Sequence, residues 1–483
     1  MDLEKLHELK NKCILVFGDY MVDQYLDGEV NRISPEAPVP VIQIKNRNQK
    51  LGGAGNVINN LITLGANVKL LGFVGDDIPG NFIMNSFQGN QSDISYLKKY
   101  ADIKTTIKTR VVSKKQQFIR MDEEQIQEAP TDYQQFIETN IEEILDSIDV
   151  VVISDYNKGA VTKKLAQFLI QEAKKRKVPV LVDPKGTDYN KYSGATFITP
   201  NTKELSMLVG KPITTELEIE DHGHELCKKY QIDYLILTRS EKGISIVQKG
   251  KPKQDFKAVA KDVIDVSGAG DTVVATMAVL QALEFSVEDS CIISNIAASV
   301  VVSKFGTSTV SLNELMTQFY NDGEFKLIHP NTAKYIIQDL RKKGKKIVFT
   351  NGCFDLIHPG HLASLKKAKS LGDVLVVAIN SDASVKRLKG PKRPILSEEN
   401  RIEMLCSLEC VDYVILMEDD TPVNLINLIH PDISIKGMDW KDKMVPEKPV
   451  IESYGGHIEF IELEKGLSTS NIIDKIRRVY DNE

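Results

Sequence analysis

The sequence predicts an α/β protein with two domains, each built on a mostly parallel sheet. Short apolar, β-branched runs alternate with amphipathic helical stretches, which is the pattern of parallel strands covered by helices on both faces. The chain has 483 residues, whereas a single hydrophobic core rarely extends beyond about 250–300 residues. We therefore expect a first domain over residues 1–325, a linker over 326–343 and a second domain over 344–483.

The first domain contains a series of apolar runs that end in small, polar or acidic residues. Ligands of parallel sheets bind beyond the carboxyl ends of the strands, where these polar residues fall. Segments 36–50 and 104–122 instead alternate polar and apolar residues, which predicts a small antiparallel β-flap on the main sheet. The expected strands of the main sheet are CILVFGD, VKLLGFVGD, DVVVISDY, VPVLVDP, ATFITPN and YLILTRS.

The second domain is expected to begin after the polar, glycine-containing stretch 321–329 and Pro330. A helical segment follows, and then a shorter series of strands resumes the α/β alternation. These expected strands are IVFTN, DVLVVAIN, DYVILM, DISIKG and HIEFIEL.

The composition limits the classes of function that the chain can have. Its 61 Lys and Arg residues nearly balance its 67 Asp and Glu residues, which argues against a duplex nucleic-acid binder. The six cysteines include no CxxC pair, so neither a disulfide framework nor a cysteine zinc site is indicated. The charged amino terminus and the absence of a long apolar run predict neither a secretory signal nor a membrane span. We expect a cytoplasmic enzyme.

The strongest chemical signal in the first half is Asp265–Thr272 (DVSGAGDT), which directly precedes a helical pattern. Backbone N–H groups of Gly268, Ala269 and Gly270 at a helix amino terminus can stabilise an anion, and the helix dipole adds to this effect. At this position, Asp271 can accept the proton of a substrate hydroxyl that attacks a phosphoryl group. The alternative is an Asp- and Gly-rich loop ahead of an ordinary helix.

This segment resembles the second signature of the ribokinase (PfkB-type) carbohydrate kinase family, and the resemblance covers nearly all of the first domain. It implies a ribokinase-like α/β sandwich in which Asp271 is the catalytic base. Ser267 and Val273 depart from the commoner Thr and aromatic residues, but neither change removes a group that the chemistry needs. No GxxxxGK[ST] motif occurs, so a P-loop is excluded as the ATP site. The resemblance places Asn201, Thr202, Lys203, Glu204, Thr238, Ser240, Gly243, Gly268, Ala269 and Gly270 at the ATP site.

Glu204 is also expected to hold Mg²⁺, directly or through water, because carboxylate oxygens suit this hard cation. Asn201 and Glu204 fit a simpler interpretation equally well. In that interpretation they form a helix cap followed by an acidic residue in the first turn.

A sugar pocket is expected where the first strand ends, because Asp19 and Asp23 can accept hydrogen bonds from hydroxyl groups there. The family resemblance adds the glycine motif of residues 52–56. Arg32, Arg110 and Arg120 on the flap suit a substrate that already carries a phosphate, although exposed flap arginines are the alternative. The residues expected to contact the sugar are Asp19, Asp23, Gly53, Asn56 and Arg120.

In the second half, His358 and His361 lie on either side of a Pro-Gly pair at an expected helix start. Both imidazoles can face one anion, and the helix amino terminus adds N–H groups that stabilise an α-phosphate under attack. A zinc site is the alternative, but no further Cys or His ligands cluster nearby in the sequence.

The stretch from Gly352 to His361 resembles the GxFDxxHxGH signature of the cytidylyltransferase-like nucleotidyltransferases, which implies a Rossmann-like domain. Segment 466–470 resembles that superfamily's carboxyl-terminal Ser/Thr motif, although Ser468 also fits a plain helix cap. The basic loop around Lys389 suits a triphosphate or a sugar phosphate, with a solvated loop as the alternative. Asp355 is expected to orient the motif. The expected nucleotide-binding residues are Gly352, Phe354, Asp355, Lys389, Arg401, Ser468 and Thr469, with His358 and His361 as catalytic residues.

The order of the two halves, with NRISPEAPVPV and RLKGPKRP present, resembles the family of bifunctional heptose-7-phosphate kinases/heptose-1-phosphate adenylyltransferases. This resemblance implies sugar phosphates and ATP as substrates, Mg²⁺ as cofactor, and neither nucleic acid nor membrane as partner. A homodimer through the first domain is expected because the flaps of relatives often meet across a dimer. One alternative is a fused enzyme that acts on another sugar or polyol phosphate, with CTP. Another is a non-catalytic protein on degenerate folds.

Overall fold

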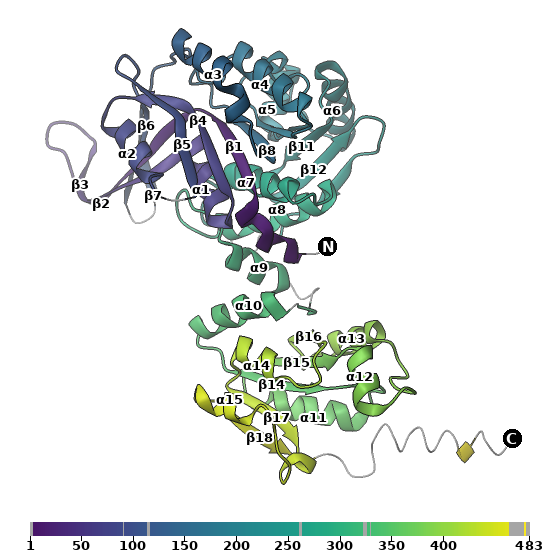
Figure 1. Cartoon of the computed structure of the whole chain (residues 1–483). Coiled ribbons are helices and arrows are strands. Elements are labelled where there is room, and N and C mark those ends of the chain that lie inside the picture. Colours follow the sequence, from purple (N-terminus) through teal and green to yellow (C-terminus); the bar gives the residue numbers. More distant parts are fainter. Residues whose placement is uncertain are drawn as a thin grey trace. The chain divides into compact units, whose positions relative to one another are not determined.

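The computed structural model describes residues 3–89, 91–113, 116–259, 263–321, 326–328, 330–462 and 478–479 (Figure 1). The chain divides into two compact units, Met1–Leu315 and Met316–Glu483. This division falls earlier in the chain than the predicted border at residue 325, and the domain bounds stay a prediction. No helix within the described ranges has both the length and the apolar character that a membrane crossing requires.

The first unit is built on a nine-stranded sheet with the order β13-β12-β11-β10-β9-β8-β1-β4-β5. All neighbours from β11 to β5 pair in parallel, and only β12 and β13 are antiparallel. The carboxyl ends of the parallel strands therefore meet along one edge of the sheet, where the predicted polar residues lie. The strands are β1 (Cys13–Gly18), β4 (Asn67–Gly75), β5 (Ser92–Tyr100), β8 (Val150–Ser154), β9 (Val180–Asp183), β10 (Phe197–Ile198), β11 (Tyr234–Thr238), β12 (Ile244–Gln248) and β13 (Gln254–Phe256).

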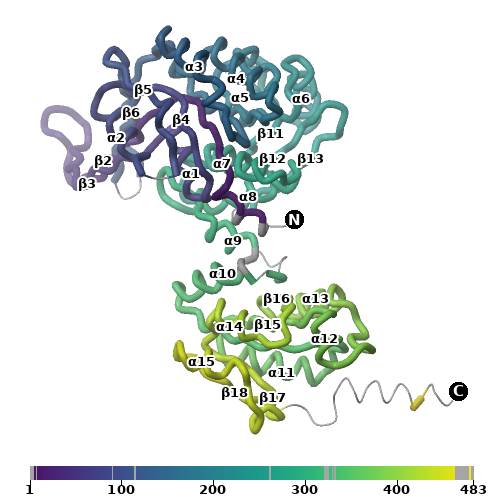
Figure 2. Tube along the Cα trace, viewed as in Figure 1, coloured from purple at the N-terminus to yellow at the C-terminus, as the bar shows by residue number. Residues whose placement is uncertain are grey.

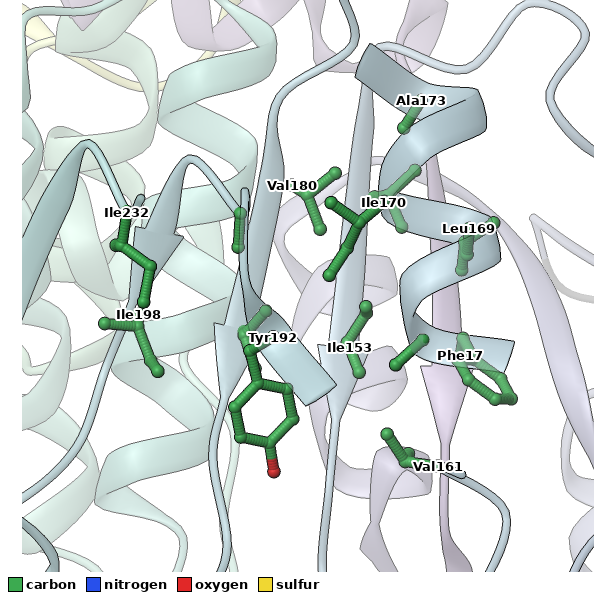
Figure 3. Close-up of a cluster of buried hydrophobic side chains, with 14 of the residues drawn as sticks. Phe17, Ile153, Val161, Leu169, Ile170, Ala173, Val180, Tyr192, Ile198 and Ile232 are labelled. Carbon is green, nitrogen blue, oxygen red and sulfur yellow. The ribbon is translucent and has the colours of Figure 1, made fainter. Parts of the chain in front are cut away.

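Helices cover both faces of this sheet, which explains why its strands are almost continuously apolar. On one face, Leu169, Ile170 and Ala173 of α4 recur at helical spacing and pack in one cluster with Phe17 and neighbouring strand residues (Figure 3). Each leucine or isoleucine side chain contributes about 1.5–3 kcal/mol when fully buried. The helical elements are η1 (Leu3–Asn11), α1 (Ala54–Leu64), α2 (Ile78–Ser86), α3 (Thr131–Ile144), α4 (Lys163–Lys175), η2 (Tyr189–Tyr192), α5 (Thr202–Val209), α6 (Glu216–Tyr230), η3 (Ser240–Lys242), α7 (Ala269–Ala282), α8 (Val287–Val302) and α9 (Leu312–Asn321).

A separate four-stranded sheet forms the flap, with the order β3-β2-β6-β7. Its strands are β2 (Tyr20–Ile33), β3 (Pro40–Gly53), β6 (Thr106–Ser113) and β7 (Gln116–Glu123). The predicted flap segments lie within it, but β2 and β6 pair in parallel rather than antiparallel. Because β2 begins only two residues after β1 ends, the flap is joined directly to the edge of the main sheet where polar residues gather.

The second unit, drawn in green to yellow in Figure 2, is built on a five-stranded sheet. The sheet is fully parallel and has the order β16-β15-β14-β17-β18. Apolar cores lie on both of its faces. Its strands are β14 (Ile347–Gly352), β15 (Val374–Asn380), β16 (Tyr413–Met417), β17 (Ile433–Gly437) and β18 (His457–Ile461). Its helical elements are α10 (Pro330–Lys342), α11 (Pro359–Lys369), α12 (Asp382–Lys389), α13 (Glu398–Cys406), α14 (Val423–Ile429), η4 (Met438–Trp440) and α15 (Lys448–Ser453).

The segment that we predicted as a linker, 326–343, packs within the second unit. Leu327 forms an isolated parallel bridge with Val414 of β16. Ile336 and Ile337 of α10 are almost completely buried in the core on one face of the sheet. Removing this helix would therefore expose apolar surface of the second unit.

Candidate active sites

Asp271 lies in the first turn of α7, directly after the glycine loop. Gly268 adopts a left-handed backbone with φ of 81°, and a Cβ there would come within 3.0 Å of the Asn56 side chain. Only glycine fits this turn without strain. The loop therefore brings the start of α7 close against Asn56 in α1.

The Asp271 carboxylate is 6% exposed and has two side-chain donors. Asn56 Nδ2 donates to Oδ2 at 2.6 Å, and Tyr156 Oη donates to Oδ1 at 2.6 Å. Burial raises the pKa of Asp271 to about 6, and the two hydrogen bonds oppose this effect. A carboxylate with such a pKa is ionised near neutral pH and is still basic enough to accept a proton from a hydroxyl group.

A cavity of about 160 Å³ opens beside Asp271 at the carboxyl ends of β8 to β11. It brings together six predicted residues from separate segments, namely Asn201, Glu204, Thr238, Gly268, Gly270 and Asp271. Six residues that were not assigned a role from the sequence also line it: Asp155, Tyr156, Asp183, Pro184, Lys185 and Thr199. All six lie in or directly after the predicted strand ends DVVVISDY, VPVLVDP and ATFITPN. The strand-end rule that located Asp19 would therefore have found them as well.

Asn201 and Glu204 form a reciprocal capping box at the start of α5. Asn201 Oδ1 accepts the Glu204 N–H at 2.9 Å, and Glu204 Oε2 accepts the Asn201 N–H at 2.9 Å. The second oxygen of Glu204 accepts from Lys185 Nζ at 2.6 Å. The simpler cap interpretation is therefore realised, and the same two side chains still line the cavity.

The donor set beside Asp271 fits a hard divalent cation. Glu204 and Asp183 both present carboxylates to the cavity. Burial, followed by the charges of Asp271 and Glu204, raises the pKa of Asp183 well above its usual range, and a cation would relieve this repulsion. No group of three potential ligands occurs among the described residues. A cation held here would therefore take its remaining ligands from phosphate oxygens and water.

Five residues predicted at the ATP site lie outside this cavity lining. Thr202 and Lys203 line a separate open groove with Met207 and Pro212. Ser240 is the first residue of η3 and Gly243 follows this element, beyond the end of β11. Ala269 is the first residue of α7, between two glycines that do line the cavity.

The predicted sugar-binding residues have different surroundings. Asp19 is buried, and its carboxylate accepts the N–H groups of Tyr156, Lys158 and Ala160 at 2.8, 3.0 and 2.9 Å. These bonds fix the loop after β8, which carries Tyr156. Asp23 on β2 forms an ion pair with Arg110.

Gly53 adopts φ of +58°, and a Cβ there would lie 2.4 Å from the Asp19 carbonyl oxygen. Only glycine allows this close approach, which places α1 and its Asn56 beside the end of β1. Arg120 lies on the exposed strand β7 and pairs with Asp122 at 2.6 Å. It does not line the cavity beside Asp271.

In the second unit, His358 is the N-cap of α11, and Pro359 begins the helix. The rings of His358 and His361 stack with centroids 3.9 Å apart at an angle of 30°. Burial, followed by the neighbouring His358, lowers the pKa of His361 to about 4. Both rings line one cavity of about 680 Å³, together with the predicted residues Gly352, Phe354, Asp355 and Lys389.

Asp355 contacts the loop that precedes α13. It is 1% exposed, and its Oδ1 accepts the N–H groups of Ile395 and Leu396 at 2.6 and 3.1 Å. Its other oxygen forms an ion pair with Arg393, which also lines the cavity. The carboxylate therefore ties the basic loop to the histidine motif.

Arg401 has a supporting position. It is completely buried, and its guanidinium donates to the carbonyls of Cys353 and Asn380 at 2.5 and 2.9 Å and to Asp382 at 2.7 Å. It does not line the cavity, so it holds together the strand ends that do. Ser468 and Thr469 lie outside the described residues.

Lys436 and Trp440 also line the cavity of the second unit, and sequence reasoning missed them. Lys436 Nζ donates to Asn351 Oδ1 at 2.8 Å, forms an ion pair with the buried Glu447, and lies 5.5 Å from the Trp440 ring centroid. Lys436 could have been found from the sequence, because it lies in IKG at the end of a predicted strand.

Family models match both units. Residues 11–314 match the pfkB family carbohydrate kinase model, and residues 349–475 match the cytidylyltransferase-like model. Among solved structures, an Arabidopsis thaliana ribokinase matches with a TM-score of 0.52 at 20% identity, over 64% of this chain and 98% of its own. Phosphofructokinase-2 from Escherichia coli matches with a TM-score of 0.55 at 18% identity, over 64% and 98%. These two likenesses concern the fold of the first unit.

Curated relatives match over nearly the full length. "Bifunctional protein HldE" of Geobacter metallireducens is 43% identical over 472 residues, which is 97% of this chain and 96% of the relative. The protein of the same name from Helicobacter pylori is 42% identical over 471 residues, 98% of this chain and 100% of the relative. Both family models and full-length identity thus agree with the site geometry. The chain belongs to the HldE family of bifunctional enzymes, which join a heptose kinase to an adenylyltransferase in ADP-heptose biosynthesis.

Proposed function

We propose that the first unit transfers the γ-phosphoryl group of ATP to the anomeric hydroxyl of D-glycero-D-manno-heptose 7-phosphate, giving the 1,7-bisphosphate. The observation that carries this proposal is the buried Asp271 carboxylate at the start of α7, beside a polar cavity. Asp271 accepts the proton as the hydroxyl oxygen forms its bond to phosphorus, and the bond to ADP breaks. The N–H groups at the start of α7 stabilise the charge on the transferred group.

Mg²⁺ supplies charge neutralisation for the ATP phosphates in this proposal. Glu204, with Asp183, would hold the ion, because both carboxylates line the cavity where those phosphates would lie. Lys185 pairs with Glu204 at 2.6 Å and is placed to contact a phosphate oxygen as well. Asn201, Thr238 and the glycines 268 and 270 complete the proposed ATP site.

We further propose that heptose 1-phosphate, bound in the second unit, attacks the α-phosphate of ATP, giving ADP-heptose and pyrophosphate. The intermediate reaches it after a separate phosphatase has removed the 7-phosphate. His358 and His361 stack at one end of α11 and line a cavity large enough for a nucleotide. Because His361 has a pKa of about 4, it acts as a neutral hydrogen-bond donor to the reacting phosphate rather than as a cation.

The experiment that tests both reactions uses the purified full-length chain with ATP, Mg²⁺ and heptose 7-phosphate, with and without a phosphatase. The mass of the products identifies the bisphosphate in one case and ADP-heptose in the other. A parallel panel of ATP, CTP, GTP and UTP with heptose 1-phosphate reports pyrophosphate release. A preference for CTP, or for another sugar or polyol phosphate, would replace this proposal with the alternative enzyme pair.

We also propose that the chain acts in the cytoplasm as a homodimer through the flap. Ile33, Phe118, Ile119 and Met121 give the flap exposed apolar side chains that a second copy can cover. Light scattering that gives the mass of one chain at micromolar concentration would contradict the dimer.

A further inference from the structure

One face of the flap points toward the first catalytic site. In the register of the sheet, Lys108 on β6 lies between Asp23 on β2 and Asp122 on β7. Residues opposite one another on neighbouring strands project on the same face. Asp23 and Lys108 are both close enough to Asp271 to influence its pKa. The face that carries Lys108 therefore faces the catalytic carboxylate.

Most of the charges on and beside this face have a bonding partner. Lys50 on β3, opposite Asp23, donates to the Thr307 carbonyl oxygen at 2.5 Å. Arg110 pairs with Asp23, and Arg120 pairs with Asp122. In the loop after β8, Lys158 pairs with Glu124 of the segment after β7 at 2.6 Å. Lys108 forms no hydrogen bond or ion pair with any residue in the described part of the chain.

The Lys108 ammonium is nevertheless held in a defined place. It lies 5.5 Å from the ring centroid of Tyr156, the residue whose hydroxyl donates to Asp271. An aromatic ring attracts a cation over its face, so Tyr156 fixes Lys108 beside the site without neutralising it. Two hydrogen-bonded carboxylates fix the loop of Tyr156 in turn, since Asp19 accepts three of its N–H groups and Asp155 accepts that of Asn157.

This position is unfavourable for an unpaired cation when the site is empty. Lys108 is half-buried, and burial lowers its pKa, with the charges of Lys158 and Arg120 adding to the effect. Asp23 and Asp122 oppose it. A half-buried ammonium near two further cations gains most from an anion that supplies hydrogen-bond acceptors.

We propose that Lys108 binds the phosphate group that the sugar substrate already carries, at the end remote from the hydroxyl held by Asp271. This assignment rests on the proposed kinase reaction and gives Lys108 the role that we expected of Arg120. Arg120 has both Nε and an Nη bonded to Asp122, so its guanidinium is already engaged. Lys108 thus distinguishes a phosphorylated sugar from the same sugar without phosphate.

The test compares the full-length wild type with Lys108→Met, Lys108→Arg and the control Lys45→Met. Lys45 is exposed on β3 of the same flap. For each protein, kcat/KM for phosphoryl transfer is measured with heptose 7-phosphate and with unphosphorylated heptose. The ratio of the two values reports selectivity for the phosphate, and any effect of the Lys108 charge on Asp271 cancels in that ratio.

We expect Lys108→Met to lower this selectivity ratio by about 10- to 100-fold, the value of a charge-assisted hydrogen bond to phosphate. Lys108→Arg should keep most of the ratio, and Lys45→Met should leave it within twofold. The KM for ATP should not change. If Lys108→Met keeps the wild-type selectivity ratio while the wild type is active, the assignment of Lys108 is overturned and the proposed kinase reaction is not.

A calorimetric titration of heptose 7-phosphate into the same proteins tests the Lys108 assignment separately from the proposed kinase reaction. A wild type that binds this sugar but transfers no phosphoryl group would refute the proposed kinase reaction. In that case a 10-fold or greater loss of binding in Lys108→Met would still support Lys108 as the phosphate ligand. Equal binding by wild type and Lys108→Met would overturn it.

Discussion

The hydrogen bond from Tyr156 to Asp271 predicts how the kinase responds to pH. In Tyr156→Phe, the Asp271 carboxylate loses the donor at 2.6 Å and keeps only Asn56. Losing a bond to the ionised form raises the pKa of a carboxyl group, so the value of about 6 should increase. The charges of Asp23 and Lys108, which also act on the pKa of Asp271, are unchanged in this variant.

The size of this effect follows from the strength of the bond. A hydrogen bond to a charged group contributes about 1.5–3 kcal/mol, and one pKa unit corresponds to about 1.4 kcal/mol. Because the protonated carboxyl can also bond to the hydroxyl, the lower end applies. The acid limb of kcat/KM should therefore move up by about one pH unit.

The assay is the pH profile of kcat/KM for phosphoryl transfer between pH 5 and 9, for wild type and Tyr156→Phe. Tyr100→Phe is the matched control, because its hydroxyl bonds to Asp132 at 3.1 Å. The control should keep the wild-type profile. If the acid limb of Tyr156→Phe stays in place or moves down, Tyr156 does not tune the base. A uniform loss of rate at every pH would assign it a purely structural role.

Other substitutions test the remaining site assignments. Asp271→Asn should abolish phosphoryl transfer and leave pyrophosphate release within twofold, since each unit has its own site; loss of both in a folded variant would refute that independence. His361→Ala should lower pyrophosphate release by about 10²- to 10³-fold, as for a lost transition-state donor, with kinase activity as the internal control. Because the pKa of His361 is about 4, its ring stays neutral from pH 6 to 8, and nucleotidyl transfer should show no His361 titration in that range; a loss of rate with a midpoint near 6.5 that His361→Gln removes would contradict this. Arg401→Leu should destabilise the second unit by about 3–5 kcal/mol in urea unfolding, because it leaves Asp382 and three carbonyls without this donor; a change below about 1 kcal/mol would show that Arg401 does not hold the strand ends together.

Much of the fold could be predicted from the sequence because the signals are local. Continuous apolar strands, helical spacing and turn glycines predict parallel sheets in both halves. The pairing of β2 with β6 could not be predicted, because it joins Met21 to Thr106 across a long separation and leaves no periodic trace in either strand.

The site residues could likewise be predicted where their signal is local, and not where it depends on the tertiary fold. Asp271, His358 and His361 lie in contiguous motifs, so their positions could be predicted from residue type and spacing. Tyr156 lies at a predicted strand end, but its bond to Asp271 could not be predicted, because only the tertiary fold brings the two residues together. The same holds for the position of Lys108 near Asp271. Arg401 was expected to contact the nucleotide. Its side chain is instead completely buried, and its guanidinium donates to backbone carbonyls.

The contact between Asn56 and Asp271 has a consequence for synthesis of the chain in the cell. The two residues are separated by 215 positions, and translation adds about 5–20 residues per second. Asp271 is therefore added to the chain roughly 10–45 s after Asn56. During the first part of that interval, until Val150 has been added, β1 also lacks its neighbour β8, because Ile14 pairs with Val150. The open edge then passes to each later strand until β13 (Gln254–Phe256) completes the sheet. The nascent kinase unit carries an incomplete sheet edge until late in its synthesis, which makes it a candidate for chaperone protection.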